Sequence, residues 1–189
     1  MKTVVFVTHN NGKFREAKEK FRSIGVELKQ YSGGYPEIQA DTLEEVALYG
    51  VEYLSDKLSE PFFLEDAGLF VDALKGFPGV YSAYVFRSIG CDGILKLLEN
   101  IVDRSAEFRS VVAYKEPGGK PVVFRGVCRG EISYEKKGSN GFGYDPIFVP
   151  MGSSLTFAEM SVKEKNSFSH RGKSLQRLLE YMRRVMGKD

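Results

Sequence analysis

The sequence predicts one α/β domain, spanning residues 1–189, built around a mixed β-sheet. Two observations support this prediction. In the first third of the chain, short apolar segments alternate with segments of helical periodicity, which is typical of βα units with parallel strands. Later, two strand-like segments flank Pro117-Gly118-Gly119, a pattern typical of an antiparallel hairpin. With 189 residues, 42% of them hydrophobic, the chain can form a sizeable core.

Each predicted strand is a short apolar run, and each predicted helix repeats its apolar residues every three or four positions. In the first half of the chain, the predicted elements are a strand at Thr3–Thr8, a helix from Lys13 to about Ser23, a strand at Val26–Tyr31, a helix from a capping box at Asp41–Glu44 to about Leu58, and a strand from Pro61 that ends on Glu65-Asp66.

The second half is predicted to begin with a helix and then to form a β-meander. Its elements are a helix near Cys91–Asn100, strands at Ala106–Tyr114 and Pro121–Val127 with an extension at Arg129–Tyr134, a short strand at Ile147–Val149, a helix that starts at a capping box at Ser161–Glu164, and a last helix from about His170 to Met186. The last helix carries an apolar stripe that we expect to face the core, with a dimer contact as the alternative. The stripe consists of Leu175, Leu178, Leu179, Met182, Val185 and Met186.

Charge and cysteine content argue against several kinds of partner. The 27 basic and 25 acidic residues leave a net charge of +2, which is too balanced to indicate a nucleic-acid or membrane surface. Cys91 and Cys128 lack metal-type spacing, so we expect two buried free thiols. The apolar run Thr3–Val7 is too short for a signal-peptide core or a membrane span, and we therefore expect a cytoplasmic protein.

The polar loop Thr8–Lys13, between the first strand and the first helix, could bind phosphate. A helix N-terminus presents free N–H groups and a partial positive charge. Lys13 adds a full charge, and Thr8 and Asn10 add neutral donors. The glycine spacing is not that of a P-loop, and an ordinary polar βα turn is the alternative explanation.

Three acidic residues could bind a metal ion. Glu65 and Asp66 follow an apolar strand, and α/β sheets bind ligands at the carboxyl ends of their strands. Neighbours on a strand point to opposite faces, so we expect only one of the two in the cleft. Glu37, in a loop stiffened by Pro36, could supply a second oxygen ligand for Mg²⁺. Solvated surface acids are the alternative.

Two later segments could bind a purine nucleotide. In Gly141–Pro146, Phe142 can stack on a flat ring and Asp145 can accept a hydrogen bond from a base N–H, although aromatic turns of this kind are also structural. In the segment Lys165–Arg171, between a short capped helix and the last helix, Lys165 and Arg171 suit phosphate or carbonyl oxygens, with solvated helix charges as the alternative.

These segments together describe a nucleotide-phosphate site, and they belong to seven motifs that occur in order along the chain. The motifs are THNNGK at Thr8–Lys13, PEIQ at Pro36–Gln39, EDAGL at Glu65–Leu69, GFPGVY at Gly76–Tyr81, FGYDPIF at Phe142–Phe148, FAEM at Phe157–Met160 and EKNSFSHR at Glu164–Arg171. Their arrangement resembles the inosine triphosphate pyrophosphatase family, also called the XTP/dITP or non-standard purine NTP pyrophosphatases. The resemblance runs nearly end to end.

The resemblance implies an elongated α/β domain in which helices flank a long mixed sheet and the substrate binds in a central cleft. It implies a homodimeric, Mg²⁺-dependent enzyme that hydrolyses ITP, dITP and XTP to the monophosphate and pyrophosphate, without nucleic-acid or membrane partners. A Maf-like nucleotide pyrophosphatase with another base preference is one alternative. A nucleotide-binding module without catalysis is another.

The resemblance also implies a role for each motif. In the first loop, the substrate contacts are Thr8, His9, Asn10, Asn11, Gly12 and Lys13, among which Thr8, Asn10 and Lys13 hold the triphosphate. Ala67 is a further contact, and the wall for the purine consists of Phe142, Gly143, Tyr144 and Asp145. The remaining contacts are Lys165, His170 and Arg171, the last two at the base edge. Glu37 and Asp66 bind Mg²⁺, and Asp66 also accepts a proton from the attacking water. Two positions depart from the family: Ala67 replaces a Ser or Thr, and Tyr49 replaces a Lys that faces phosphate in some members.

Overall fold

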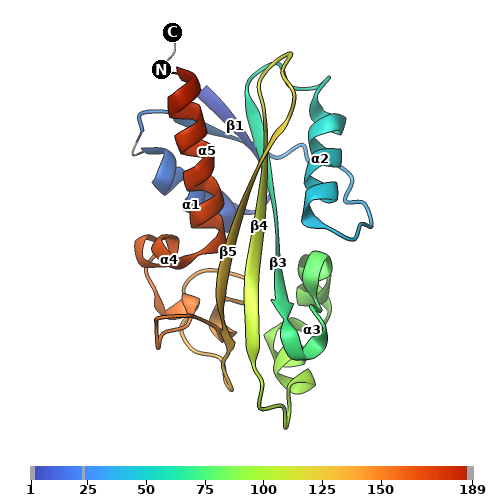
Figure 1. The fold of residues 1–189 in the computed structure, drawn as a ribbon, viewed down its shortest axis with the longest axis vertical. Coiled ribbons are helices and arrows are strands. Elements are labelled where there is room, and N and C mark those ends of the chain that lie inside the picture. Colours follow the sequence, from blue (N-terminus) through green and yellow to red (C-terminus); the bar gives the residue numbers. More distant parts are fainter. Residues whose placement is uncertain (1–2, 23, 187–189) are drawn as a thin grey trace.

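In the described part of the chain, six strands form one mixed sheet in the order β2-β1-β3-β4-β5-β6, with helices on both faces (Figure 1). The computed structural model describes residues 3–22 and 24–186. The predicted helix end at Ser23 and the side chain of Met186 lie outside this part. The α/β class and the mixed sheet are confirmed, because β1 pairs in parallel with β2 and β3, whereas the pairs β3–β4, β4–β5 and β5–β6 are antiparallel.

The strands differ in length, and the three longest lie in the middle of the sheet. They are β1 Thr3–Val7, β2 Glu27–Tyr31, β3 Phe62–Val71, β4 Ser105–Lys115, β5 Val122–Ile132 and β6 Phe148–Pro150. The helices are α1 Asn11–Arg22, α2 Leu43–Leu54, α3 Ser82–Leu97, α4 Val162–Phe168 and α5 His170–Met186, with 3₁₀ turns at Asp72–Leu74, Gly79–Tyr81, Asp145–Ile147 and Phe157–Glu159.

Strand alternation places a different apolar layer on each face of the upper sheet in Figure 1. Phe6 and Phe63 point to the face covered by α1 and α5, and Val5 and Leu64 point to the face covered by α2. The predicted stripe of α5 is buried at Leu175, Leu178, Leu179 and Met182, as expected. Val185 departs from it, with 39% of its surface exposed near the end of the helix.

A third apolar cluster fills the other end of the molecule, the lower end in Figure 1. It joins α3 and the lower halves of β3 and β4 to the segment between β5 and α4. Its buried phenylalanines are Phe108, Phe148 and Phe157, whose ring centroids lie within 6.0 Å of one another. Because β3, β4 and β5 run through both ends, they connect the two core regions and give the molecule its long axis (Figure 1).

Several predicted boundaries were wrong. The third strand does not end on Glu65-Asp66 but continues to Val71, because β4 pairs with it along its whole length. The helix predicted near Cys91–Asn100 begins at Ser82 and ends at Leu97. The apolar repeat of this helix does not run continuously through the sequence, because Gly90, with φ 61° and ψ −161°, interrupts the helical backbone.

Helix caps and the second hairpin strand also refine the prediction. The cap of α2 is Thr42 with Glu45, one position later than predicted, and α2 ends at Leu54 instead of Leu58. The predicted extension at Arg129–Tyr134 continues β5 without a break, but the strand ends at Ile132. The predicted capping box at Ser161–Glu164 is confirmed at the start of α4. Within the described residues, none of the helices combines the length and apolarity that crossing a membrane would require.

Candidate active site

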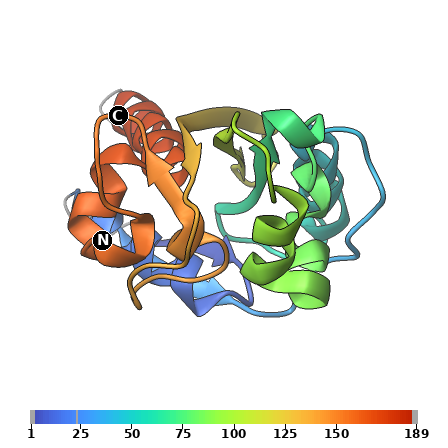
Figure 2. The same cartoon turned by 90° about the horizontal axis from the view of Figure 1, so that it is seen from below.

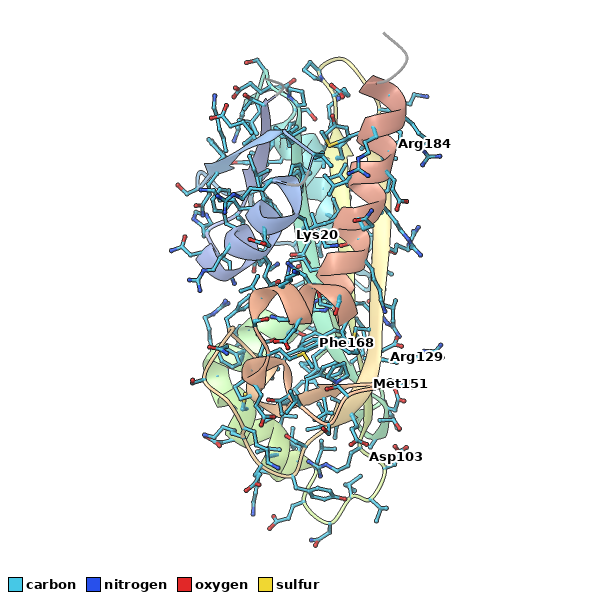
Figure 3. All side chains as sticks on the ribbon, turned by 90° about the vertical axis from the view of Figure 1, so that its left-hand side faces the viewer. Lys20, Asp103, Arg129, Met151, Phe168 and Arg184 are labelled. Carbon is cyan, nitrogen blue, oxygen red and sulfur yellow. The ribbon has the colours of Figure 1, made fainter. Side chains whose placement is uncertain are left out.

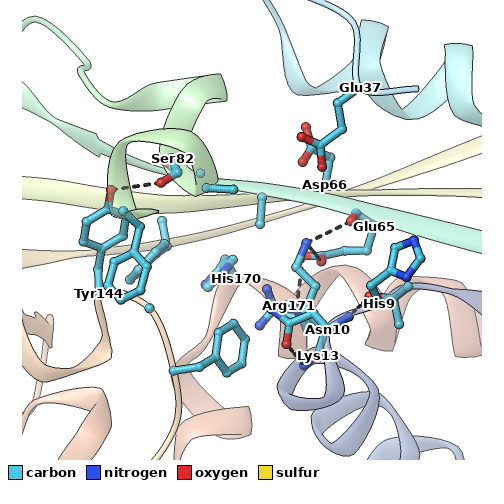
Figure 4. A pocket seen from close by; sticks show the side chains of 18 of the residues that line it. His9, Asn10, Lys13, Glu37, Glu65, Asp66, Ser82, Tyr144, His170 and Arg171 are labelled. Atoms are coloured by element: carbon cyan, nitrogen blue, oxygen red, sulfur yellow. Dashed lines mark hydrogen bonds and ion pairs between the residues drawn. The ribbon is translucent and has the colours of Figure 1, made fainter. Parts of the chain in front are cut away.

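The candidate site lies beside the part of β3 whose edge is no longer paired with β1. β1 ends at Val7 and pairs with β3 only through Phe62–Leu64. Among the described residues, no strand pairs with this edge from Glu65 up to the bridge at Phe70. A cavity of about 530 Å³ opens along this free edge (Figure 4). It follows the sheet edge, so it is lined from both faces of the sheet.

Both acids of the pair after Leu64 therefore line the cavity, and the expectation that only one would do so was wrong. Strand alternation does send them to opposite faces, and Figure 4 shows Glu65 directed toward Lys13, and Asp66 toward Glu37. The prediction failed because it assumed a cleft confined to one face.

The loop Thr8–Lys13 is held in shape by its own side chains. Asn10 caps α1, because its Oδ1 accepts a hydrogen bond from the backbone N–H of Lys13 at 3.0 Å. The hydroxyl oxygen of Thr8 accepts one from the N–H of Asn10 at 3.1 Å. Thr8, His9, Asn10 and Lys13 line the cavity, so this loop presents a capped helix N-terminus and one full positive charge to it.

Asn11 and Gly12, expected to contact the substrate, do not line the cavity. The side chain of Asn11 instead accepts a hydrogen bond from Gln30 at 3.3 Å. Gly12 faces the Phe142 ring so closely that a Cβ atom there would lie 2.3 Å from a ring carbon. Gly12 therefore lets α1 approach the Phe142 ring.

Glu65 is a buried anchor for two cations. Its Oε2 lies 2.8 Å from Lys13 Nζ and its Oε1 lies 3.2 Å from Arg171 Nε, while Ser110 donates a hydrogen bond to Oε1 at 2.8 Å. Burial alone would raise the pKa of this carboxyl, but Arg171 and Lys13 outweigh burial and hold the pKa well below its usual range. Glu65 therefore stays ionised and is unsuited to accept a proton near neutral pH.

Asp66 has the opposite surroundings. Its Oδ2 is buried and has no hydrogen-bond partner among the described residues. Burial raises the pKa of this carboxyl to about 7; Lys13 opposes the rise, and the nearby Glu65 and Glu37 add to it. A carboxylate with a free oxygen and a pKa near neutrality can accept a proton or bind a cation.

Glu37 and Asp66 fit a divalent cation of the Mg²⁺ type. Both offer only carboxylate oxygens, and the unpartnered Oδ2 of Asp66 lacks the positive partner that a buried anion needs. Within the described ranges, no group of three or more His, Cys, Asp or Glu side chains could hold a metal ion alone. This is compatible with Mg²⁺, which commonly binds one or two carboxylates together with substrate phosphates and waters.

At the other end of the cavity lies an aromatic wall backed by charge. Phe142, Gly143, Tyr144 and Asp145 all line the cavity, as does Lys165. Lys165 Nζ lies 2.6 Å from Asp145 Oδ2 and 4.7 Å from the centre of the Phe142 ring. Asp145 also accepts a hydrogen bond from the N–H of Phe142 at 2.9 Å, which fixes the turn. The arrangement suits a flat ring with polar edges.

His170 and Arg171 are both buried, so the alternative of a solvated helix charge is wrong for Arg171, as it is for the buried Lys165. The His170 ring stacks on Phe108 with centroids 4.6 Å apart, and its Nδ1 has no hydrogen-bond partner among the described residues. Burial lowers the pKa of His170 well below its usual value, so this imidazole is neutral. Arg171 Nη1 lies 2.5 Å from Glu16 Oε2. Both side chains are thus held rigidly at the cavity.

Glu16 on α1 is a site component that the sequence analysis missed. Only 3% of its surface is exposed, and its two oxygens contact Lys165 at 2.6 Å and Arg171 at 2.5 Å. Burial would raise the pKa of Glu16, but Arg171 and Lys165 outweigh burial and lower it. In the sequence, Glu16 looks like any charged residue of an exposed helix, so no local signal could have identified it.

The two departures from the family pattern differ in their consequences. Ala67 lines the cavity, so the hydroxyl it lacks would have faced the site. Tyr49 does not line the cavity but stacks on Tyr53 along α2, with ring centroids 6.5 Å apart. The cavity wall also includes Ser82, Ala83, Phe86 and Arg87 of α3, which lie before the predicted start of this helix.

Comparison with known proteins decides the family. Residues 4–181 match the model of the Ham1 family. This chain belongs to the Ham1 family. The resemblance found in the sequence is thereby confirmed.

Close relatives of this Ham1-family chain share its full length. A dITP/XTP pyrophosphatase of Methanopyrus kandleri is 53% identical over 186 residues, which cover 98% of this chain and 99% of the relative. One of Thermococcus kodakarensis is 53% identical over 180 residues, covering 95% and 97%. Among solved structures, a HAM1 protein from Coxiella burnetii superposes with a TM-score of 0.84 at 31% identity, covering 96% of this chain and 98% of that one.

Proposed function

We propose that this Ham1-family protein hydrolyses the non-standard purine nucleoside triphosphates dITP, XTP and ITP to the nucleoside monophosphate and pyrophosphate. One observation carries the proposal: the buried carboxylate of Asp66, whose Oδ2 has no hydrogen-bond partner among the described residues, lies beside Lys13 in a cavity that ends in an aromatic wall. The dITP/XTP pyrophosphatases of M. kandleri and T. kodakarensis, which match this chain over nearly its whole length, support the choice of substrate.

In the proposed reaction, water attacks the α-phosphorus and pyrophosphate leaves. Asp66 accepts the proton of the water, for which its buried Oδ2, without a hydrogen-bond partner among the described residues, is available. Lys13, together with the helix N-terminus of α1, neutralises charge on the phosphates. Bound Mg²⁺, held by Glu37 and Asp66, would supply further neutralisation of the phosphate oxygens. Glu65 takes no proton and positions Lys13 and Arg171.

Base recognition follows from hydrogen-bond complementarity. Hypoxanthine and xanthine present a 6-oxo acceptor and an N1–H donor, whereas adenine presents the reverse pattern. A donor from His170 or Arg171 at the 6-oxo group would therefore be left unpaired by ATP, and unpaired buried groups are costly. Phe142 stacks on the purine and Asp145 accepts from its edge in this proposal.

The proposal includes the wider properties implied by the resemblance. Residues 1–189 form one catalytic domain that depends on Mg²⁺, acts in the cytoplasm as a homodimer, and uses small nucleotides instead of nucleic acid or membrane as partners. The near-neutral charge of the chain supports the last point.

A substrate panel tests the proposal. Pyrophosphate release is measured for dITP, XTP, ITP, GTP, ATP and dTTP at equal concentration, with and without Mg²⁺. We expect dITP, XTP and ITP to exceed ATP by at least about tenfold, since each missing buried hydrogen bond is worth about 1–3 kcal/mol. Preference for another base would favour the Maf-like alternative, and binding without pyrophosphate release would favour the non-catalytic module.

A further inference from the structure

Helix α3 forms a wall of the cavity that none of the seven motifs assigns to the substrate. Ala83, Phe86 and Arg87, spaced three and four positions apart on one helical face, line the cavity together with Ser82. The wall is tied to the aromatic turn, because the Tyr144 hydroxyl donates a hydrogen bond to the carbonyl of Ser82 at 2.9 Å and the Tyr144 ring meets Phe86 edge-on. Figures 1 and 2 show α3 on the opposite side of the sheet from α1 and α5.

The cations that line the cavity differ in how far they are neutralised. Lys13 is paired with Glu65, Lys165 with Glu16 and Asp145, and Arg171 with Glu16 and Glu65. Arg87 is exposed and, among the described residues, makes no hydrogen bond or ion pair. It is therefore the cavity cation whose charge and donors are available to a ligand without breaking an existing contact.

We propose that Arg87 is a further substrate-binding residue that contacts the phosphate chain of the nucleotide from the α3 wall. The proposal rests on the proposed function. The ligand class is a polyphosphate, because a guanidinium only donates hydrogen bonds and its fork matches phosphate oxygens.

The purine is a poorer partner for Arg87 than the phosphates. The charged and polar groups proposed to surround the base are almost fully buried: Lys165, His170 and Arg171 are each at most 3% exposed. Arg87 is exposed, as expected for a residue at the open mouth of the cavity, where a charged chain retains part of its water. A polyphosphate carries several negative charges, and an unpaired cation on the cavity wall adds to the positive potential that attracts it.

Calorimetric titration with inorganic tripolyphosphate in the presence of Mg²⁺ tests the proposal without relying on catalysis. We expect Arg87→Ala to weaken tripolyphosphate binding about tenfold, the usual scale for a lost charge-assisted hydrogen bond. Arg87→Lys keeps the charge and loses the fork, so its binding should fall between the two. Arg184→Ala is the matched control, since Arg184 is exposed near the far end of α5 (Figure 3) and should bind tripolyphosphate like the wild type.

Kinetics with dITP and XTP complete the test. Arg87→Ala should raise KM for both substrates by a similar factor and leave kcat within about twofold, since the contact is present in ground and transition states alike. Unchanged tripolyphosphate binding in Arg87→Ala, or a KM effect confined to one base, would overturn the proposal. If the wild type hydrolysed neither nucleotide, the proposed function would fail, while the calorimetric comparison would still decide whether Arg87 binds polyphosphate.

Discussion

Glu65 and Asp66 are adjacent carboxylates whose pKa values move in opposite directions. Glu65 lies between Lys13 and Arg171, whose charges outweigh its burial, and it stays ionised. Asp66 points to the other face of the strand, where burial and two other carboxylates raise its pKa to about 7. Strand alternation, which separates the two side chains, therefore places one carboxylate between two cations and leaves the other with the raised pKa that suits its proposed role as proton acceptor.

Asp66→Asn should abolish turnover and also stabilise the fold at alkaline pH. The folded pKa of Asp66, about 7, lies above its unfolded value of 3.8, so the stability linked to the protonated form is complete below pH 3.8 and is lost as pH rises through 7. An asparagine cannot ionise. The free energy of unfolding of Asp66→Asn should therefore match the wild type near pH 4 and exceed it by up to about 4 kcal/mol at pH 8.

Urea unfolding at both pH values, without metal, measures this difference. Asp56→Asn, at an exposed position of the chain, is the control and should change stability by less than about 0.5 kcal/mol at either pH. Near-normal turnover in Asp66→Asn would contradict the role assigned to this residue.

Glu65→Gln should have the opposite effect on stability. It leaves Lys13 and Arg171 without their shared carboxylate in a buried setting, and breaking such a pair usually costs about 3–5 kcal/mol. The folded pKa of Glu65 is depressed, so its contribution is present above its unfolded pKa of 4.5 and is lost as pH falls. Thermal unfolding should show a large deficit at pH 7 that shrinks toward pH 3; an equal deficit at both pH values would argue against the charge-based explanation.

The site residues were predictable from sequence where they belong to a local pattern. Thr8 to Lys13 stand between a strand and a helix, and Phe142 stands between glycines, so both are visible in the sequence. Glu16 is not, because its burial depends on α1 packing beside α4 and α5, whose residues follow it by about 150 positions. Only tertiary contact distinguishes Glu16 from an exposed helix acid.

At the scale of elements, α1 reaches the aromatic turn because Gly12 has no side chain. Gly12→Ala should push the Phe142 ring aside, since the new Cβ would lie 2.3 Å from it. We expect the KM for dITP to rise about tenfold through loss of stacking, with a destabilisation of about 1–3 kcal/mol. Gly119→Ala, where a Cβ makes only ordinary contact at 3.4 Å in the β4–β5 turn, should leave the KM unchanged. Equal KM values for Gly12→Ala and the wild type would show that Phe142 is not the stacking residue.

Helices and strands were predictable where their apolar sequence pattern is continuous. The prediction failed where tertiary contacts extend an element beyond its pattern or where the backbone interrupts it. The stripe from Leu175 to Met182 identified α5, and Thr3–Val7 identified β1. The lower half of β3 was missed because Glu65 and Asp66 look like a strand end, although β4 pairs with β3 to Val71. The first turns of α3 were missed because Gly90 breaks the backbone within the helix.

At the scale of the whole molecule, the cavity lies between two core regions that share β3, β4 and β5. A ligand that contacts both regions should stabilise the fold as a unit. For Asp66→Asn, which cannot turn the substrate over, dITP with Mg²⁺ at about 100 times the dissociation constant should add about 2.7 kcal/mol, or roughly 5–10 °C in Tm for a chain of this size. Differential scanning calorimetry should show a single shifted transition. An equal shift with ATP would contradict the proposed base recognition.

The early end of β1 has a consequence for how this architecture can change. Every residue added to β1 beyond Val7 in register with β3 would form backbone hydrogen bonds along the unpaired edge that carries Glu65 and Asp66. In this fold, a sheet with more of its backbone paired would therefore leave no room for a nucleotide. We expect a protein whose first strand is longer by a few residues to be more stable but inactive.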